Sequence, residues 1–478
     1  MSRKCLAPGV RTGALFCLVL TLAGCEVTAD KGNLPAPSSL DAYAASRSVT
    51  GSKVPWPSDA WWQAYGDKQL GHLIEEGLHG ASRMRIAAAR AQLAQVAVGP
   101  ARGALAPTLA ASAKVDQERQ SYNYLIGSDF VPKGWNDSAL ATLDLNWEID
   151  FWGKNRAALA AATGEAKAAA AEAAATRLAV STGIAQAYAG LAALYAERDA
   201  AANAVSVRGK TVELIGERFG KSLENESALE RVRSAEAAAK ASLAAIDENI
   251  ALTRNALAAL VGAGPDRGLA IKRPRTVGGR FTRVPKSLPV ELLGRRPDIV
   301  AARLRAEAAS RRIDQAQAAF YPNVNLAAVL GRQVLGLDMF SHGTSNFGSV
   351  GPAVSLPIFD GGQRKAGKRS AEANYVMAVA TYDEALVNAL HEVADALTSQ
   401  RHLASRLSQT RRSAEAAQKA YTIVKSRYEG GLATYLEVLS AEDALIDARR
   451  ATAALRARAF ALDVSMVRAL GGGFRKSE

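Results

Sequence analysis

The chain has 478 residues, and its 59 Lys and Arg outnumber its 46 Asp and Glu, giving a formal net charge of +13. The basic residues are dispersed along helical segments and form no stripe interleaved with aromatics, which excludes nucleic acid as a partner. Of the three cysteines, Cys5 and Cys17 lie in an N-terminal signal segment, so the mature chain, left with Cys25, can form no internal disulfide and no cysteine-based metal site.

The N-terminus is predicted to be an export signal spanning residues 1–24. It begins with three basic residues, Arg3, Lys4 and Arg11. The mostly apolar run that follows, 14–22, is too short to span a membrane as a helix. It ends in LAGC, which resembles a bacterial lipobox, and Cys25 would then be the lipidated first residue of the mature chain. Glu26 at the next position favours the outer membrane; an ordinary cleaved signal is the alternative.

Residues 25–79 are predicted to be a lipidated N-terminal extension, and residues 80–262 the first of two repeats. In the first repeat we expect helices at about 80–99, 157–215 and 225–262, and strands at about 108–118 and 139–151. The strands are predicted from the alternation of apolar and polar residues, and the helices from long alanine-rich stretches without proline.

The second strand contains the sequence LDLNWEID, which alternates strictly between apolar and polar residues. One face carries Leu143, Leu145, Trp147 and Ile149, and the other carries Asp144, Asn146, Glu148 and Asp150. The strand could lie on a soluble core with its polar face in water. Alternatively, Glu148 and Asp150 could form a catalytic carboxylate pair, as in glycoside hydrolysis. A third interpretation places lipid on one face and a water-filled lumen on the other.

The second half of the chain repeats the first after a linker or equatorial segment, 263–290. The second repeat is assigned to 291–470, followed by a C-terminal tail, 471–478. Its helices are expected at about 296–318, 365–427 and 435–470, and its strands at about 322–332 and 347–359. Each half also carries a turn between its long helix and the shorter one. The first of these helical tips is expected to be about three residues longer than the second.

The two long helices would each measure roughly 90 Å at 1.5 Å per residue, which no compact globular domain requires. The chain is therefore predicted to build a tall tube in which long helices lie beside stacked pairs of short helices. The high alanine content would allow these helices to approach closely.

Three segments resemble the outer-membrane efflux factors of the TolC/OprM type, in the lipoprotein branch called NodT-like. The segments are ELLGRRPDIVAARLRAEAASRRIDQAQAAFYPNVNL (291–326), WPSDAWWQAYGDKQLGHLIEEGL (56–78) and RYEGGLATYLEVLSAE (427–442). The resemblance covers nearly the whole mature chain. It implies a mainly α fold with a small transmembrane β part. Three copies would form a twelve-stranded β-barrel in the outer membrane and a long α-helical barrel in the periplasm.

The resemblance also implies roles for residues of the second strand and of the two tips. Asp144, Asn146, Glu148 and Asp150 would line the lumen. The periplasmic gate would include Arg427, Tyr428, Gly431, Thr434 and Glu437 of the second tip and Arg218, Phe219 and Leu223 of the first. Glu437 occupies the position of a gate carboxylate, but Ser440 and Ala433 stand where some members carry a second acid and an Arg. We expect Tyr428 and Arg427 to hold the closed state by cross-helix hydrogen bonds; helix capping or a surface role is the alternative.

The function implied is that of a passive exit duct in a tripartite efflux system. The chain would carry out no energy-coupling chemistry of its own. The expected partners are two further copies of the chain, a periplasmic adaptor (membrane fusion protein), an inner-membrane pump of the resistance-nodulation-division (RND) type, and outer-membrane lipids through the anchor on Cys25. Drugs or other toxic small molecules are the expected cargo. The alternatives within the family are type I protein secretion and metal-ion efflux. A periplasmic coiled-coil adaptor lipoprotein is the non-channel alternative.

The sequence offers no support for an enzyme, and neither a cofactor nor a metal is expected. The five histidines do not form a metal-ligand motif such as HExxH, and no GxSxG occurs. The segment GERFGKS (216–222) ends like a phosphate-binding loop, but it has one residue too few between its glycines and lies between two helices.

Overall fold

The computed structural model describes residues 32–39, 42–43, 55–123, 128–275 and 294–475. The predicted signal, Cys25 and most of the linker lie outside these residues. The chain divides into two compact units. Unit 1 contains residues 1–37, 92–168 and 302–381, and unit 2 contains residues 38–91, 169–301 and 382–478. Each unit is built from both halves of the sequence.

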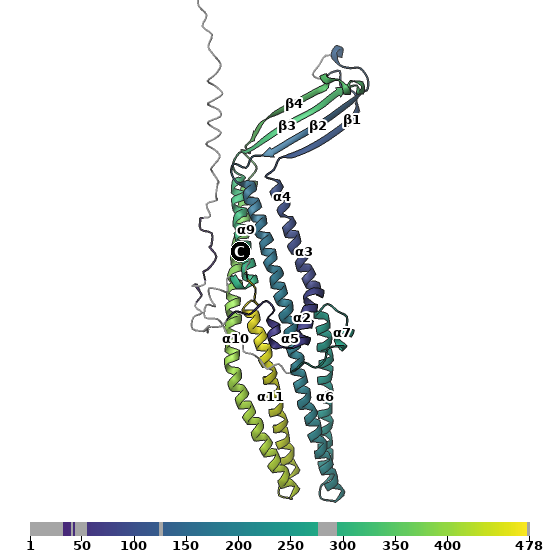
Figure 1. Cartoon of the computed structure of the whole chain (residues 1–478), viewed down its shortest axis with the longest axis vertical. Helices are drawn as coiled ribbons and strands as arrows, with labels where there is room; N and C mark the ends of the chain where they lie inside the picture. The colour runs from purple at the N-terminus through teal and green to yellow at the C-terminus, as the bar shows by residue number, and fades with distance from the viewer. Residues whose placement is uncertain (1–31, 40–41, 44–54, 124–127, 276–293, 476–478) are drawn as a thin grey trace, which may run out of the picture. The chain divides into compact units, whose positions relative to one another are not determined.

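Unit 1 contains one antiparallel sheet of four strands in the order β1-β2-β3-β4 (Figure 1). The strands are β1 (Thr108–Glu118), β2 (Asn136–Glu148), β3 (Asn323–Leu335) and β4 (Asn346–Ser355). The hairpin of the first half joins the hairpin of the second half through β2 and β3, which pair from Ser138 with Leu335 to Glu148 with Asn325. Each outer strand, β1 and β4, has one neighbour in the sheet, so both sheet edges are open among the described residues.

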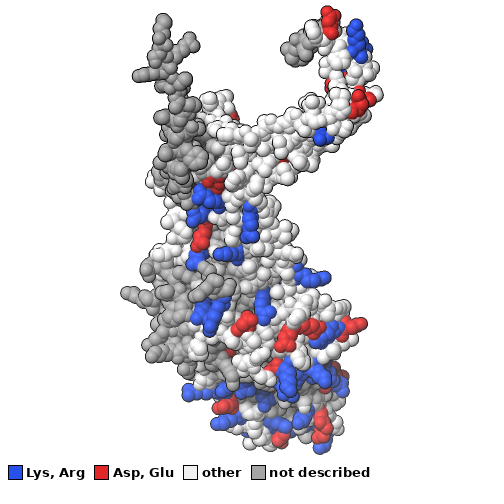
Figure 2. Space-filling view, turned by 45° about the horizontal axis from the view of Figure 1, so that its top comes forward, with Lys and Arg blue, Asp and Glu red and all other residues white. Residues whose placement is uncertain are grey.

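One face of this sheet is apolar and exposed. The register aligns Leu109 with Leu145, and Leu143 with Leu330, on the same face. Seven large apolar side chains on this face are exposed: Leu109, Val115, Leu143, Trp147, Leu330, Val350 and Val354. White atoms cover most of the sheet in Figure 2, and charged side chains gather at its loop end. A strand packed on a soluble core would have its apolar face covered. The exposed apolar face therefore argues against that interpretation of the alternating strand.

Strand β2 begins and ends three residues earlier than predicted. The Ile149 N–H still donates to the Val324 carbonyl at 2.9 Å, but the chain then turns towards helix α5 (Lys154–Gly220). Asp150, predicted to lie on the strand, lies in this turn. Its carboxylate accepts hydrogen bonds from the N–H groups of Asn155 and Arg156 at 3.1 and 2.8 Å. These N–H groups have no partner within the helix, which explains why Asp150 caps α5 rather than extending the strand.

Two helical hairpins repeat with a constant offset of 209 residues. Helices α5 and α6 (Glu226–Leu260) form the first hairpin, and α10 (Gln363–Glu429) and α11 (Tyr435–Ala469) form the second. All four pairs of bounds differ by 209, as from Lys154 to Gln363. The connections therefore have equal lengths, 221–225 and 430–434, and the prediction of a longer first tip is wrong. The short Ser-Ala-Glu stretches of the two hairpins do not occupy equivalent positions.

Unit 2 is organised around a helix that was not predicted, α2 (Lys68–Gly80). Asp67 caps it by accepting hydrogen bonds from the N–H groups of Gln69 and Leu70 at 2.9 and 3.3 Å. Leu70, Leu73 and Ile74 have no exposed surface and pack in the largest core cluster. The helix predicted at 80–99 is present as α3 (Ser82–Val96) and α4 (Val98–Gly103), which are separated at Ala97. The extended residue Ala81 separates α3 from α2. The other α-helices of the described residues are α7 (Asp266–Leu269) and α9 (Pro297–Ala318).

The start of the predicted C-terminal tail is a packed part of unit 2. Gly471, Gly472 and Gly473 all have positive φ, at 89°, 59° and 88°. A Cβ atom on each would collide with a different segment, represented by Arg295, Leu178 and Ser58. Just before them, the Ala469 carbonyl accepts a hydrogen bond from the buried Arg296 guanidinium, which also pairs with Asp298 and Glu392. The glycines allow this close approach because a side chain would leave no room.

Within the described residues, one helix, α5, contains an 18-residue stretch that is apolar enough to cross a membrane by length and composition. Inside the chain 44% of that stretch is buried. Helices in the core of soluble proteins meet the same criterion, so this is weak evidence for a spanning helix.

Candidate functional site: the polar sheet face and the two helical tips

The face of the sheet opposite the apolar one is lined by hydrogen-bonded polar groups. The register places Ser112 beside Thr142, and Ala110 beside Asp144. The Ser112 and Thr142 hydroxyls are 2.8 Å apart, and the Thr142 hydroxyl donates to the Asp144 carboxylate at 2.6 Å. Asn146 lies on the same face, and its backbone carbonyl accepts from the Thr108 hydroxyl at 3.0 Å. These contacts hold the Asp144 carboxylate on the polar face.

This polar face is acidic. Its charged side chains are Lys114 and four carboxylates, Asp116, Glu118, Asp144 and Glu148. Lys114 pairs with Asp116 at 2.6 Å and Lys154 of α5 pairs with Glu148 at 2.7 Å, which leaves Glu118 and Asp144 as the carboxylates without a basic partner among the ion pairs of this face. A water-filled space against this face would therefore favour cations.

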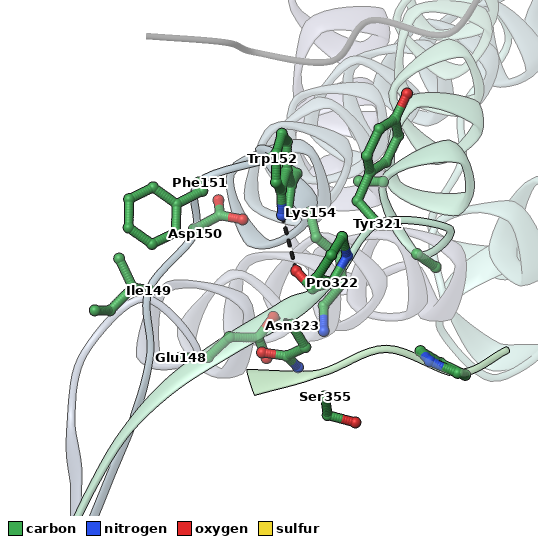
Figure 3. Close-up of a pocket in the computed structure, with 13 residues that line it drawn as sticks. Glu148, Ile149, Asp150, Phe151, Trp152, Lys154, Tyr321, Pro322, Asn323 and Ser355 are labelled. Atoms are coloured by element: carbon green, nitrogen blue, oxygen red, sulfur yellow. Dashed lines mark hydrogen bonds and ion pairs between the residues drawn. The ribbon is translucent and has the colours of Figure 1, made fainter. Parts of the chain in front are cut away.

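A cavity of about 240 Å³ lies where the sheet meets the helices of unit 1 (Figure 3). Glu148 pairs there with Lys154 of α5 at 2.7 Å. The Trp152 indole donates to the Pro322 carbonyl at 2.8 Å and stacks on Tyr321 with the ring centres 5.0 Å apart. Glu148 and Asp150 are thus bound to different partners, one to a lysine and the other to the first turn of α5. This arrangement favours a structural role over the catalytic carboxylate pair.

The two tips contact each other through Tyr428. Its ring is 2% exposed in a cluster that contains Ile215 and Leu229 of the first hairpin. The Tyr428 hydroxyl donates to Glu224 at 2.7 Å, and the Arg218 guanidinium lies 4.6 Å from the centre of the Tyr428 ring. Burial and the adjacent Glu224 carboxylate raise the pKa of Tyr428. The phenol therefore stays protonated and keeps donating its hydrogen bond.

The two arginines predicted at the tips, Arg427 and Arg218, form different hydrogen bonds. Arg427 donates to the Leu432 carbonyl of its own turn at 3.1 Å. Arg218, by contrast, donates to the Tyr428 carbonyl at 3.4 Å and so joins the two tips. Phe219 and Leu223 are 40% and 60% exposed. Of the two residues expected to act across helices, the geometry supports Tyr428, and the first tip contributes the arginine.

The second tip ends in a capping box. The Glu437 carboxylate accepts from the Thr434 N–H at 2.7 Å and from the Thr434 hydroxyl at 3.2 Å, and the Glu437 N–H donates to that hydroxyl at 3.4 Å. Gly431 precedes it with φ at 74°, and Ser222 holds the equivalent position of the first tip at 60°. Thr434 and Glu437 therefore begin helix α11, as the capping alternative predicted.

The capping box of Thr434 and Glu437 contributes to the stability of the fold in a pH-dependent way. The hydrogen bonds from Thr434 lower the pKa of the Glu437 carboxyl. A lowered carboxyl pKa means that the cap stabilises the fold above the usual carboxyl range, and that this stabilisation is lost as the pH falls through the lowered pKa. We expect Glu437→Gln to lower the thermal unfolding midpoint at neutral pH and to match the parent at strongly acidic pH. Glu415→Gln, at an exposed position of α10, should show no such pH-dependent difference.

The sequence matches the outer membrane efflux protein family over residues 73–263 and 288–472. The chain belongs to the outer membrane efflux protein family. It is 30% identical over 434 residues to the multidrug resistance outer membrane protein MdtP of Escherichia coli O6:H1, covering 88% of this chain and 87% of MdtP. It is 33% identical over 360 residues to the fusaric acid resistance protein FusA of Burkholderia cepacia, covering 74% of this chain and 67% of FusA.

Solved structures show the same architecture for this efflux protein. The outer membrane protein VceC of Vibrio cholerae is 45% identical with a TM-score of 0.83, covering 88% of this chain and 100% of VceC. The outer-membrane channel OprN is 25% identical with a TM-score of 0.84, covering 94% and 99%. The predicted fold class, mainly α with a small β part in a duplicated arrangement, is confirmed, as is the predicted outer-membrane location. The family and fold are those of channel proteins.

Sequence reasoning missed the main partner of Tyr428 in this efflux protein. Glu224 lies in the first tip, 204 positions away, and no motif connects it to Tyr428. The 209-residue repeat could have suggested it, because Ala433 occupies the equivalent position of the second tip. Where one repeat has a charged residue and the other has an alanine at the equivalent position, the charged residue can make a contact that the other repeat lacks.

Proposed function

We infer that this efflux protein is the exit duct of a tripartite efflux system, conducting small molecules passively across the outer membrane. The observation that supports this most directly is the pair of opposite sheet faces. Seven large apolar side chains are exposed on one face, and carboxylates with hydrogen-bonded hydroxyls occupy the other. Lipid against the first face and water against the second satisfies both.

We propose that three copies assemble to close the sheet. No strand in the described part of one chain pairs with the outer edge of β1 or β4, and open edges within lipid leave backbone N–H and C=O groups without partners. Three four-stranded sheets would make twelve strands, which is the assembly implied by the family resemblance. β1 of one copy would then pair with β4 of the next.

The proposed partners are a periplasmic adaptor and an inner-membrane pump, with the two tips as the end that faces them. Tyr428, Glu224 and Arg218 would hold the tips closed, and Arg427, Gly431, Thr434 and Glu437 would shape the second turn. Phe219 and Leu223 are exposed and available to a partner. Cys25 would carry the lipid anchor, supported by the LAGC sequence.

The proposed cargo is toxic small organic molecules, supported by relatives named for multidrug and fusaric acid resistance. The test is accumulation of a panel of dyes, antibiotics and aromatic acids in a deletion strain, with the gene restored on a plasmid. Increased accumulation that restoration of the gene reverses would support the proposed function as an exit duct. It would also show which class of compound is exported. Accumulation equal to the parent strain, in a background lacking other outer-membrane efflux proteins, would contradict it.

The acidic sheet face predicts a channel that prefers cations. A charge about 10 Å from a passing ion attracts a cation and repels an anion by about 0.4 kcal/mol each in water. The difference is about 0.8 kcal/mol, so Asp144→Asn should lower the cation-to-anion permeability ratio roughly fourfold. The measurement is the reversal potential of reconstituted channels under a KCl gradient. Asp137→Asn is the matched control, because Asp137 lies on the same strand with the opposite orientation. An equal change in both variants would show that Asp144 does not line the conduction path.

A further inference from the structure

A stretch of the second hairpin is rich in arginine and contains no acidic residue. Residues 396–414 of α10 and 448–462 of α11 together carry eight arginines and no Asp or Glu. We call these two segments the arginine band. They lie side by side in Figure 1, and the Thr452 hydroxyl of α11 donates to the Thr410 carbonyl of α10 at 3.4 Å. These two segments thus concentrate arginines, with no acidic residue of their own, along one pair of packed helices.

The band contains a groove of about 510 Å³ between α10 and α11. Arg406 of α10 and Arg458 of α11 both line it, together with Ser405, Gln409 and Thr410. Both arginines are exposed, and within the described part of the chain neither guanidinium forms an ion pair. Two guanidinium groups, each able to bind an acid group through two parallel hydrogen bonds, therefore face one space beside neutral donors.

The hairpin architecture does not require these arginines. The 209-residue offset places Glu197 and Asn249 of the first hairpin at the positions of Arg406 and Arg458. The equivalent segments of the first hairpin, 187–205 and 239–253, carry four acids and two bases. The positive charge is therefore a property of the second hairpin alone.

The equivalent segments of the first hairpin offer a neighbouring copy few acids that could neutralise the band. Two of the four acids there are already paired, Asp199 with Arg273 at 2.5 Å and Asp247 with Arg198 at 2.6 Å. Only Glu197 and Glu248 remain against eight arginines. Of the eight arginines, Arg406 and Arg458 are the two that line the groove.

We propose that the α10–α11 groove binds a small anion with two acidic groups, carboxylate or phosphate, held between Arg406 and Arg458. The groove has the volume of a small-molecule site, and Ser405 and Gln409 can donate to the remaining oxygens, whereas the Thr410 hydroxyl already donates to the Arg406 carbonyl at 2.8 Å. The anion could be cargo inside the duct or a solute of the surrounding periplasm. The site itself does not depend on which source supplies it.

The test is isothermal titration calorimetry of citrate and of pyrophosphate with the purified full-length protein in detergent at low ionic strength. We expect the double variant Arg406→Gln/Arg458→Gln to bind at least about tenfold more weakly, because each lost guanidinium removes charged hydrogen bonds. The matched control is Arg411→Gln/Arg412→Gln, which removes two charges from the same band outside the groove. It should bind within about twofold of the parent. Equal weakening in both double variants, or no binding by the parent, would overturn the proposal.

A second measurement distinguishes the two sources. Citrate is added to either side of reconstituted channels while the cation current is recorded. Block that disappears in Arg406→Gln/Arg458→Gln places the groove in the conduction path and makes the anion a cargo analogue. Groove-dependent binding in calorimetry without block places it on the periplasmic surface. Both results are consistent with the anion site. If the reconstituted channel is closed or inactive, the calorimetric comparison still tests whether the site binds the anion.

Discussion

Tyr428→Phe should shift the tip towards its open state by about one to two orders of magnitude. The substitution keeps the ring in its cluster and removes only the hydroxyl that donates to Glu224 at 2.7 Å. A hydrogen bond to a charged group contributes about 1.5–3 kcal/mol, and every 1.4 kcal/mol is tenfold in an equilibrium. The direct readout is the open probability of single channels in planar bilayers. Cells expressing the variant should also become more sensitive to a large hydrophilic antibiotic.

The same contact predicts a coupling between the two tips. Glu224→Gln should open the channel by a smaller amount, because an amide oxygen still accepts the hydrogen bond but without the charge. The double variant should add little to Tyr428→Phe alone, since both changes act on one interaction. Tyr435→Phe removes a hydroxyl from the same tip that forms no hydrogen bond with the described residues, and it should leave conductance unchanged. Additive effects of the two variants, or an effect of the control, would contradict a Tyr428–Glu224 latch.

Gly471→Ala should destabilise the protein by about 2–5 kcal/mol. The left-handed backbone at Gly471, with φ at 89°, costs an L-residue about 1–2 kcal/mol. The new Cβ would also collide with the backbone carbonyl of Arg295, and moving packed backbone costs about 1–3 kcal/mol. Arg295 cannot retreat easily, because the neighbouring Arg296 is buried and bound to Asp298, Glu392 and the Ala469 carbonyl. A lower thermal unfolding midpoint and less protein in the outer membrane are expected.

Gly264→Ala is the matched control for this prediction. Gly264 is exposed, its backbone is not in the left-handed region, and a Cβ atom there would meet nothing within 4 Å. The substitution should be neutral or slightly stabilising, because alanine restricts the unfolded chain more than glycine does. If Gly471→Ala unfolds at the same temperature as this control, the close packing of the C-terminal glycines is not needed for stability.

The sequence alone determined the elements whose signals are local and repeated many times. Strict alternation over LDLNWEID sets the two faces of β2, because the side chains of a strand alternate between its faces. Uninterrupted helix-forming stretches placed the long helices within a few residues of α5 and α10. The family followed from several motifs in the same order. Each of these inferences rests on many residues, so an error at one position does not change it.

Only the tertiary structure decided the contacts that depend on a single partner far away in the chain. Asp150 continues the alternation of β2, yet it caps α5, because the first N–H groups of the helix lack partners. Tyr428 donates a hydrogen bond to Glu224 of the other tip. Arg406 and Arg458 line the same groove only because α10 and α11 pack side by side in antiparallel directions. The alternation cannot mark where a strand stops, and spacing within one helix cannot name a neighbour on another. Unpaired backbone groups determine where the strand ends, and packing between helices determines which distant residues come into contact.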